Sequence, residues 1–170
     1  MNTLLGKVAV VSGSSKGIGS AIAQKMANEG AKVVINYNGN QAAADEVVKA
    51  IKTNGGDAFA LQGDVSKRAD IVRLFDETIA HFGKVDVWVN NAGVMLNAMI
   101  KDLGEDQFEK SIDINFKGVF YSLQEAASKL ADNGSIINLS STVTRTIFPT
   151  YGVYSATKAA VEQLSRVFAK

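Results

Sequence analysis

A regular alternation of short apolar runs and amphipathic segments constrains the fold of this chain more than any other feature. Five runs of four or five residues are rich in apolar and β-branched side chains: 8–11, 32–35, 58–61, 85–89 and 135–139. Each is followed by a segment whose apolar residues recur every three or four positions, which is typical of an amphipathic helix. Apolar strands separated by such helices indicate a parallel sheet that helices cover on both faces.

The helical segments can be bounded from the sequence. One face of the first helix is expected to carry the apolar residues Ile18, Ala21, Ile22 and Met26. The helix after the third strand is predicted to begin at Ser66, as an N-cap, and to end at Gly83. A single long helix is expected over 105–130, and a last helix from about 152 to the end of the chain.

The predicted topology is a doubly wound α/β sheet of the Rossmann type with the strand order 3-2-1-4-5. Crossovers between parallel strands are right-handed, and this order places the switch point between the first and fourth strands. Ligands of such sheets bind beyond the carboxyl ends of the strands at the switch point. No repeat or linker divides the chain, so residues 1–170 are interpreted as a single dinucleotide-binding domain.

Composition excludes several classes of function. The 18 basic and 17 acidic residues are interspersed, with a formal net charge of +1, so we expect neither nucleic acid nor a membrane surface as a partner. The chain has no cysteine and one histidine, so we expect no disulfide, no thiol nucleophile and no metal site. The first residues lack the apolar run of a signal peptide, and no later run could span a bilayer; a cytoplasmic protein is the expectation.

A glycine-rich loop lies between the first strand and its helix, at 13–19 (Gly-Ser-Ser-Lys-Gly-Ile-Gly). Glycines permit a tight turn and a close approach of backbone to phosphate, and the following helix presents free N–H groups to an anion. A flexible surface turn would have the same composition, but the position of this loop favours a nucleotide site.

Tyr154 and Lys158 form a candidate acid/base pair near the C-terminus. Residues four apart on a helix share a face, and a neighbouring ammonium favours the phenolate form of a tyrosine. Tyr151 competes for the role because it lies seven residues before Lys158. However, Pro149 precedes it closely, so the helix has barely begun there, and Tyr154 is the preferred candidate.

Several short motifs occur in the order in which one enzyme family carries them, at Gly13, Gly17, Gly19, Asp64–Val65, Asn90–Gly93, Asn115, Ser141, Tyr154 and Lys158. From about Leu5 onward, the chain resembles the short-chain dehydrogenase/reductase family, most of all its reductases of 3-oxoacyl, sugar and ring-ketone substrates. The resemblance implies an oxidoreductase that transfers a hydride between a nicotinamide cofactor and a small-molecule ketone or secondary alcohol.

The resemblance also implies roles for four catalytic residues. Tyr154 would be the general acid and base, and Lys158 would support its phenolate and hold the nicotinamide ribose. Ser141 would donate a hydrogen bond to the substrate oxygen, and Asn115 would hold a water beside the lysine. A purely structural alternative for Asn115 is an asparagine that is hydrogen-bonded to local backbone within a helix. Apolar loops at 94–100 and 142–150 predict a mid-sized apolar substrate.

The expected cofactor is NADP rather than NAD. The exit of the second strand, at 36–40, contains no carboxylate to hold an adenosine ribose, and Lys16 could face a 2′-phosphate, although a solvated loop lysine would look the same. With the family's positions carried over, the predicted cofactor-binding residues are Gly13, Ser15, Lys16, Gly17, Ile18, Gly19, Tyr37, Asn38, Asp64, Val65, Asn91, Ala92, Gly93, Tyr154 and Lys158.

In one respect the chain departs from the family pattern. Family members continue beyond the last helix, whereas this sequence stops at Lys170 without a helix stop signal, so the domain is expected to be truncated in its last helix. A rival interpretation is therefore a truncated dinucleotide-binding module that binds cofactor or partner subunits without turnover. An epimerase using the same tyrosine and lysine is disfavoured by the spacing of the glycine loop.

The full-length protein is expected to be a homodimer or homotetramer, because the long late helices of the family resemble a dimer interface. Apolar side chains on these helices fit that expectation, and core packing explains them equally well: Phe116, Phe120, Leu164 and Phe168.

Overall fold

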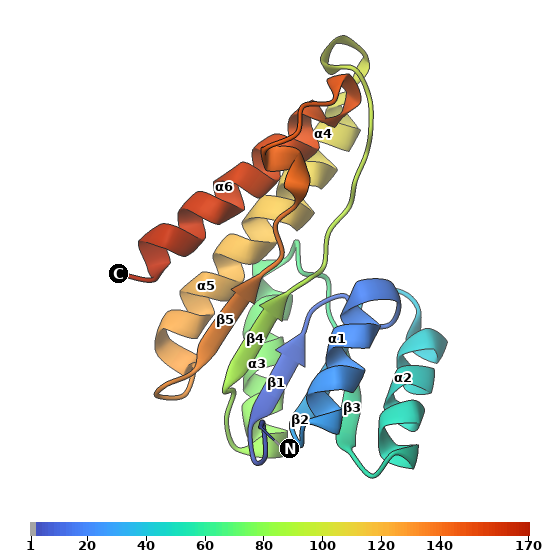
Figure 1. Cartoon of the computed structure of the whole chain (residues 1–170), viewed down its shortest axis with the longest axis vertical. Coiled ribbons are helices and arrows are strands. Elements are labelled where there is room, and N and C mark those ends of the chain that lie inside the picture. The colour runs from blue at the N-terminus through green and yellow to red at the C-terminus, as the bar shows by residue number, and fades with distance from the viewer. Residues whose placement is uncertain (1–2) are drawn as a thin grey trace.

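The computed structural model describes residues 3–170 and contains one parallel sheet of five strands in the order β3-β2-β1-β4-β5 (Figure 1). The strands are β1 (Val8–Val11), β2 (Lys32–Tyr37), β3 (Asp57–Gln62), β4 (Val87–Asn90) and β5 (Ser135–Asn138). Both the parallel sheet and its predicted order are confirmed. β1 and β4 are neighbours, so the switch point lies between them.

Helices cover both faces of the sheet (Figure 1). Their bounds are α1 (Gly17–Asn28), α2 (Gln41–Thr53), α3 (Arg68–Phe82), α4 (Glu105–Ile112), α5 (Gly118–Lys129) and α6 (Gly152–Phe168). Short 3-10 helices occupy Ile100–Asp102, Thr142–Thr144 and Pro149–Tyr151. In Figure 1, α1 and α2 lie on one side of the sheet, with α3 and α5 on the other, and α6 runs alongside α4 and α5.

Two apolar layers hold these helices to the sheet. One layer joins β1 and β2 to small residues of α1 and α2, among them Ala23, Ala27 and Ala44. The other joins β4 to α3 and α5, and in it the rings of Phe75 and Trp88 stack at 4.2 Å with an interplanar angle of 2°. Burial of this apolar surface is the main favourable term in folding.

The buried face of α1 differs from the expected one. Ile18 is 68% exposed and Ala21 is exposed, whereas Gly19, Ala23 and Ala27 are buried. Of the expected face, Ile22 and Met26 do pack against the core. The fully buried positions are small residues because α1 packs closely against β1 and the loop before it. Periodicity alone assigned the face by hydrophobicity, and the close approach overrode it at the first turn.

Two boundaries of α3 had been predicted, and one was wrong. Gly83 ends the helix in a left-handed conformation at φ +86°, as expected. Ser66 is not the N-cap, because α3 begins two residues later, at Arg68. The Asp64 carboxylate instead accepts hydrogen bonds from the Ser66 N–H at 3.0 Å and the Ser66 hydroxyl at 2.7 Å. Ser66 therefore belongs to the turn after β3.

The single helix expected over 105–130 is interrupted. A π-helical segment at Asp113–Lys117 separates α4 from α5 and contains Asn115. Such segments insert one residue into a helical turn and often occur at functional sites. Gly118 follows directly, and a Cβ there would lie 2.9 Å from the carbonyl oxygen of Val65, so the helix approaches the end of β3 at van der Waals limits.

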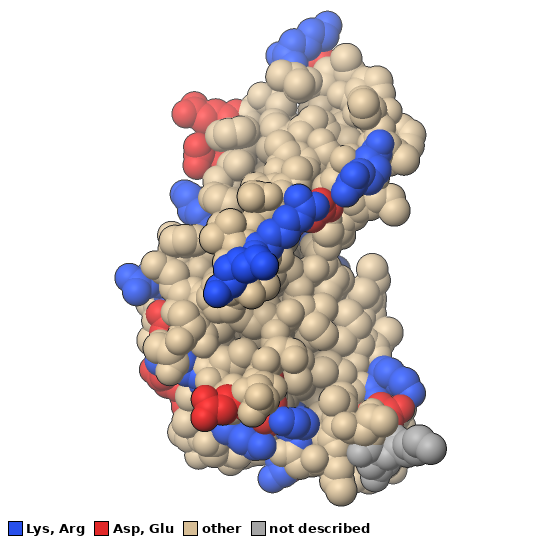
Figure 2. Space-filling view, turned by 60° about the vertical axis from the view of Figure 1, so that its left-hand side comes forward, with Lys and Arg blue, Asp and Glu red and all other residues tan. Residues whose placement is uncertain are grey.

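The surface carries mixed charge. Figure 2 shows basic and acidic side chains interspersed over the face that it presents, with broad uncharged areas between them. Across residues 3–170, none of the helices combines the length and the apolar character needed to cross a lipid bilayer. In the same residues, no three His, Asp or Glu side chains gather in a way that could hold a metal ion.

Candidate active site

A cavity of about 430 Å³ opens at the carboxyl ends of β1 and β4, at the switch point of the sheet. Thirteen of the fifteen predicted cofactor residues line it: Gly13, Ser15, Lys16, Gly17, Ile18, Gly19, Tyr37, Asn38, Asp64, Val65, Asn91, Ala92 and Gly93. Tyr154 and Lys158 lie outside its wall. Four further residues line it without having been predicted: Asn36, Gly63, Val94 and Ile114. All four adjoin predicted site residues in the sequence, so proximity to those residues could have found them.

Asn36 ties together the exits of three strands. Its Oδ1 accepts a hydrogen bond from the Gly13 N–H at 3.0 Å, and its Nδ2 donates to the carbonyls of Gly63 at 3.0 Å and Leu61 at 3.3 Å. The side chain is 1% exposed, so these bonds replace water at backbone groups that would otherwise be unpaired. Asn36 fixes the glycine loop relative to β2 and β3. The available signal was a polar residue near the carboxyl end of an otherwise largely apolar strand.

Ser12 and Asn91 hold the glycine loop against β4. The Ser12 hydroxyl accepts hydrogen bonds from the N–H groups of Asn91 and Ala92, both at 3.0 Å. In return, the Asn91 amide donates to the carbonyls of Ser12 at 2.8 Å and Gly13 at 3.1 Å. A Cβ on Gly19 would lie 2.5 Å from the Asn91 amide nitrogen, so a larger residue would not fit. The loop is shaped by hydrogen bonds before any ligand binds.

The rim of the cavity near β2 carries one cation and no carboxylate of its own. Lys16 immediately precedes α1 and is exposed, and Asn38 is exposed at the exit of β2. The Gln62 amide donates to the Asn38 carbonyl at 3.2 Å and so fixes this exit. Asp64 is the only acid in the lining, and its Oδ1 is already bonded to Ser66. This rim can therefore accept an additional negative charge.

Lys158 is buried beside the exit of β5. It is 6% exposed, and its ammonium donates to the Leu139 carbonyl at 2.7 Å. Burial lowers the pKa of Lys158 below its ordinary value of 10.5, because desolvation disfavours the charged form. Its Nζ lies 5.8 Å from the centre of the Tyr154 ring. The predicted pair is thus brought together on one face of α6.

The two candidate tyrosines occupy different elements. Tyr151 ends the 3-10 helix Pro149–Tyr151 and caps α6, whereas Tyr154 lies within the first turn of α6. Their ring centres are 6.4 Å apart. The expectation that the helix has barely begun at Tyr151 is confirmed. Of the two, Tyr154 has the helical one-turn relation to Lys158.

Asn115 is fully engaged with backbone. Its Oδ1 accepts from the Val94 N–H and its Nδ2 donates to the Val94 carbonyl, both at 2.8 Å, while Nδ2 also lies 3.3 Å from the Thr157 hydroxyl. A Cβ on Gly93 would lie 3.3 Å from Asn115 Oδ1 and 3.8 Å from Lys158 Nζ. The asparagine and the lysine therefore approach Gly93 from two sides, at the inner end of the cavity. The bonds to Val94 are long-range, not local ones within the helix.

Ser141 follows β5 and caps the 3-10 helix Thr142–Thr144. Its Oγ accepts a long hydrogen bond of 3.4 Å from the Val143 N–H. This contact uses a lone pair of the oxygen and does not engage the O–H hydrogen. Because Lys158 binds the carbonyl of Leu139, two residues earlier, the exit of β5 brings the serine and the lysine to one edge of the sheet. That edge can donate hydrogen bonds to a ligand oxygen.

Comparison with known proteins identifies relatives over nearly the whole chain. The sequence model of a family described as short chain dehydrogenase matches residues 7–170. An uncharacterised oxidoreductase of Methylorubrum extorquens is 47% identical over 169 residues, which are 99% of this chain and 68% of that protein. Elsinochrome reductase 1 of Elsinoe fawcettii is 46% identical over 165 residues, which are 96% of this chain and 62% of that protein.

Solved structures match equally well. The landomycin C-6 ketoreductase LanV with bound NADP and rabelomycin superposes with a TM-score of 0.92 at 36% identity, over 98% of this chain and 70% of that one. Other similar structures, two of them from Burkholderia cenocepacia, also contain NADP. The chain thus spans roughly two thirds of the length of these proteins, from 62% to 70% for those compared.

Proposed function

Since this chain belongs to the short-chain dehydrogenase family, we propose that it transfers a hydride between NADP(H) and a carbonyl group or secondary alcohol, with Tyr154 as general acid and base. The observation that carries this proposal is the geometry of α6. It holds Tyr154 and a buried, anchored Lys158 on one face, beside the cavity at the switch point of the sheet. The chain spans only part of its relatives' length, so the activity of the whole protein is part of the proposal.

The cavity fits a dinucleotide. The glycine loop exposes backbone at the N-terminus of α1, where a pyrophosphate is favoured, and Gly19 leaves no room for a side chain that would displace the loop. Lys16 and the absence of an acid at the exit of β2 suit a 2′-phosphate. The NADP found in similar structures supports this choice. We therefore expect a preference for NADPH over NADH that weakens in Lys16→Ala.

Proton transfer is assigned to Tyr154. When bound, reduced nicotinamide supplies the hydride to the carbonyl carbon. Tyr154 donates its phenol proton to the carbonyl oxygen, and in the reverse direction it removes the proton of the alcohol. The Lys158 ammonium, 5.8 Å from the ring centre, stabilises the phenolate that remains. Lys158 keeps its orientation because its ammonium is bonded to the Leu139 carbonyl.

Two further residues assist this step. The Ser141 hydroxyl donates to the substrate oxygen, where negative charge develops in the transition state. Asn115 holds Val94 by both backbone groups and so fixes the segment after Gly93 against Lys158. In this proposal, Asn115 positions the backbone of Val94 beside Lys158. Any water that Asn115 binds lies next to that lysine.

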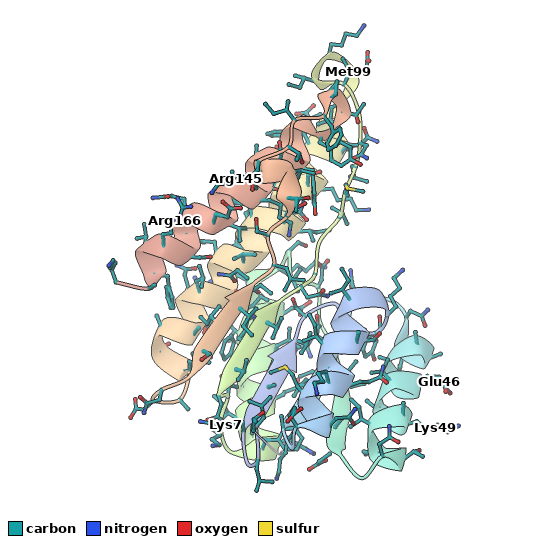
Figure 3. The ribbon with its side chains drawn as sticks, in the orientation of Figure 1. Lys7, Glu46, Lys49, Met99, Arg145 and Arg166 are labelled. Carbon is teal, nitrogen blue, oxygen red and sulfur yellow. The ribbon has the colours of Figure 1, made fainter. Side chains whose placement is uncertain are left out.

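The substrate is proposed to be apolar. Apolar side chains are exposed on the two loops above the site: Met95, Met99, Ile147 and Phe148. The Ala98 N–H donates to the Thr150 carbonyl at 3.2 Å, which joins these loops into one surface, and Met99 lies near its outer end (Figure 3). The names of two relatives, a reductase and a ketoreductase, support a carbonyl substrate. We propose a mid-sized ring ketone or the corresponding secondary alcohol.

The test is oxidation of NADPH in the presence of apolar ring ketones, with small charged oxo acids as the comparison series. Turnover that favours the ring ketones is the expected result. Tight NADPH binding, measured by fluorescence, without oxidation by any ketone would instead favour the alternative, a module that binds cofactor or partner subunits without turnover.

Assembly with further copies stays a prediction. An apolar groove of about 230 Å³ lies between α4 and α6, and a second of about 240 Å³ lies between α5 and α6. Phe120 and Phe168 border the second groove and are about two fifths exposed. A homodimer that covers these grooves would bury this apolar surface. Light scattering of the full-length protein measures the mass directly, and a monomer at all concentrations would contradict the prediction.

A further inference from the structure

Glu162 lies on α6 one turn beyond Lys158 and binds the loop that carries Ser141. Its Oε1 accepts a hydrogen bond from the Ser140 hydroxyl at 2.6 Å and lies 2.9 Å from the Thr144 hydroxyl. Ser140 and Thr144 stand on either side of Ser141 in the sequence. One carboxylate oxygen of Glu162 therefore binds the loop at a residue before Ser141 and at a residue after it.

The loop is closed on itself around the same point. The Thr144 N–H donates to the Ser141 carbonyl at 3.3 Å, and the Thr144 hydroxyl lies 3.0 Å from that carbonyl. A hydroxyl has a single hydrogen, so the Thr144 hydrogen is shared between the Ser141 carbonyl and Glu162. A displacement of Thr144 would therefore also move the backbone of Ser141, because two contacts join them.

The helix holds the exit of β5 at two consecutive residues. Lys158 binds the Leu139 carbonyl at 2.7 Å, and Glu162 binds the next residue, Ser140, at 2.6 Å. Tyr154, Lys158 and Glu162 follow one another at steps of four, so all three lie along one face of α6. The position of the Ser141 loop relative to Tyr154 is consequently set by two side chains of the helix that carries Tyr154.

Glu162 is an acceptor at neutral pH. The hydrogen bonds from Ser140 and Thr144 hold the pKa of Glu162 below its ordinary range, and the charges of Arg145 and Arg166 act in the same direction. Both arginines are labelled beside α6 in Figure 3. Residue Glu162 is partly buried, and its bond to Ser140 is exposed to solvent while its contact with Thr144 is part-buried.

We propose that Glu162 is a positioning residue of the reaction, which places the Ser141 hydroxyl at the carbonyl oxygen that Tyr154 protonates. It acts through Ser140 and Thr144 and has no direct contact with the reacting atoms. The inference rests on the proposed function, because it assigns Glu162 a part in the same carbonyl reduction. A residue that held the loop only for stability would affect the enzyme with or without Ser141.

A double-mutant cycle on kcat tests this role. Glu162→Ala is expected to lower kcat about 10-fold, because misplaced catalytic groups lose transition-state stabilisation, while the KM for NADPH changes less than about 2-fold. Ser141→Ala alone is expected to lower kcat about 100-fold, as for loss of one oxyanion donor. Because Glu162 acts through Ser141, adding Glu162→Ala to Ser141→Ala should lower kcat by less than about 2-fold further.

Conservative and reciprocal variants complete the test. Glu162→Gln retains an acceptor oxygen for both hydroxyls and should keep at least about half of kcat. The double variant Ser140→Ala/Thr144→Val removes the two donors and should reproduce Glu162→Ala, which covers the case in which Glu162→Ala does not fold. Glu46→Ala removes an exposed carboxylate on α2, on the other side of the molecule (Figure 3), and should leave kcat unchanged.

The outcomes are separable. A wild type that shows no turnover contradicts the proposed function and removes the role of Glu162 with it. A wild type that turns over, with losses from Glu162→Ala and Ser141→Ala that multiply in the double variant, overturns only the role of Glu162. Equal damage from Glu162→Gln and Glu162→Ala also overturns it, because the acceptor oxygen would then not be what matters.

Discussion

Two adjoining regions are built in different ways: the cofactor cavity, and the proposed catalytic edge, by which we mean the exit of β5 and the loop that carries Ser141. At the cavity, β1 has a neighbour on each side and its four residues are at most 2% exposed. Asn36, Ser12 and Asn91 hold the glycine loop through its backbone. At the catalytic edge, β5 pairs only with β4 within residues 3–170, and Ile137 is 46% exposed. At this edge, the loop that carries Ser141 is held by side chains of α6 and not by a strand on each side.

This difference teaches which contacts each function depends on. The cavity is shaped by buried and part-buried hydrogen bonds to the backbone of the glycine loop and of the exits of β3 and β4, so this region is set when the sheet forms. The exit of β5 and the loop after it depend on four side-chain contacts from α6, which are Lys158 to Leu139, Glu162 to Ser140 and to Thr144, and Ser165 to Asn138. Changes at α6 should therefore weaken cofactor binding much less than they weaken turnover, because most of the predicted cofactor residues line the cavity.

The sharpest separation of the two regions is expected from Tyr154→Phe. Loss of the phenol hydroxyl removes the general acid and should lower kcat about 1,000-fold, while the Kd for NADPH changes little. Tyr151→Phe is the matched control, since Tyr151 only caps α6, and it should keep most of kcat. Stopped-flow kinetics and NADPH fluorescence provide the two readings. The reverse ranking of the two variants would exclude Tyr154 as the acid.

Gly19→Ala should disturb the glycine loop at the cavity while leaving α6 unchanged. The new Cβ would lie 2.5 Å from the Asn91 amide and 2.7 Å from the Gly13 carbonyl, so the loop must move. Overpacking of this kind should cost about 2 kcal/mol in the free energy of unfolding and weaken NADPH binding at least about 10-fold. Gly104→Ala, whose Cβ would meet open space, is the control for urea denaturation. Unchanged NADPH binding in Gly19→Ala would show that the loop is not preformed as described.

An asparagine-to-alanine substitution in each region compares how much stability the side-chain hydrogen bonds of that region contribute. Asn36→Ala leaves the buried Gly63 carbonyl and the part-buried Gly13 N–H without their partner and should cost about 2 kcal/mol. Asn138→Ala removes half-buried bonds to Asn90 and Ser165 and should cost about 1 kcal/mol, because water can reach β5. Urea denaturation of both variants gives the two values. Equal losses would mean that the two regions are equally closed to water.

The smallest expected effect is a pH dependence of stability from Lys158. Burial lowers its folded pKa, so the cost of burying the ammonium is fully present below that pKa and is relieved as pH rises toward 10.5, the ordinary value. In this window the unfolded chain binds more protons, so the wild type should gain stability relative to Lys158→Met, by at most about 1.4 kcal/mol per pH unit. Urea denaturation between mildly and strongly alkaline pH measures the difference. A flat or falling difference would contradict burial of the ammonium.

The sequence predicted the sheet order because its signal is simple. Apolar strands that alternate with amphipathic helices permit few topologies, and the glycine loop locates the switch point. The same reasoning placed Tyr154 ahead of Tyr151, since Pro149 marks where a helix can begin. Predictions based on local patterns therefore succeeded where chain connectivity decides the outcome.

Predictions failed where contacts distant in sequence decide. Nothing local announces that Asn115 bonds to Val94, so the π-helical segment was missed and one long helix was expected. Ser66 is a different case, because a local contact decides it: the Asp64 carboxylate, two residues earlier, binds its N–H and hydroxyl and keeps it in the turn before α3. Asn36 and Glu162 were passed over for the same reason as Asn115, because their partners lie on other elements.

The π-helical segment has a consequence for how the chain tolerates changes in length. An α-helix advances about 100° per residue, so the extra residue turns α5 by about that angle relative to α4. This rotation of α5 relative to α4 lets Asn115 face Val94 while Gly118 lies against Val65, and both valines line the cavity. Deleting any one residue of Asp113–Lys117 would satisfy one of these contacts only by losing the other. A deletion scan of folded yield should therefore find a deep minimum at Asp113–Lys117, between two helices, and a shallower one at the loops.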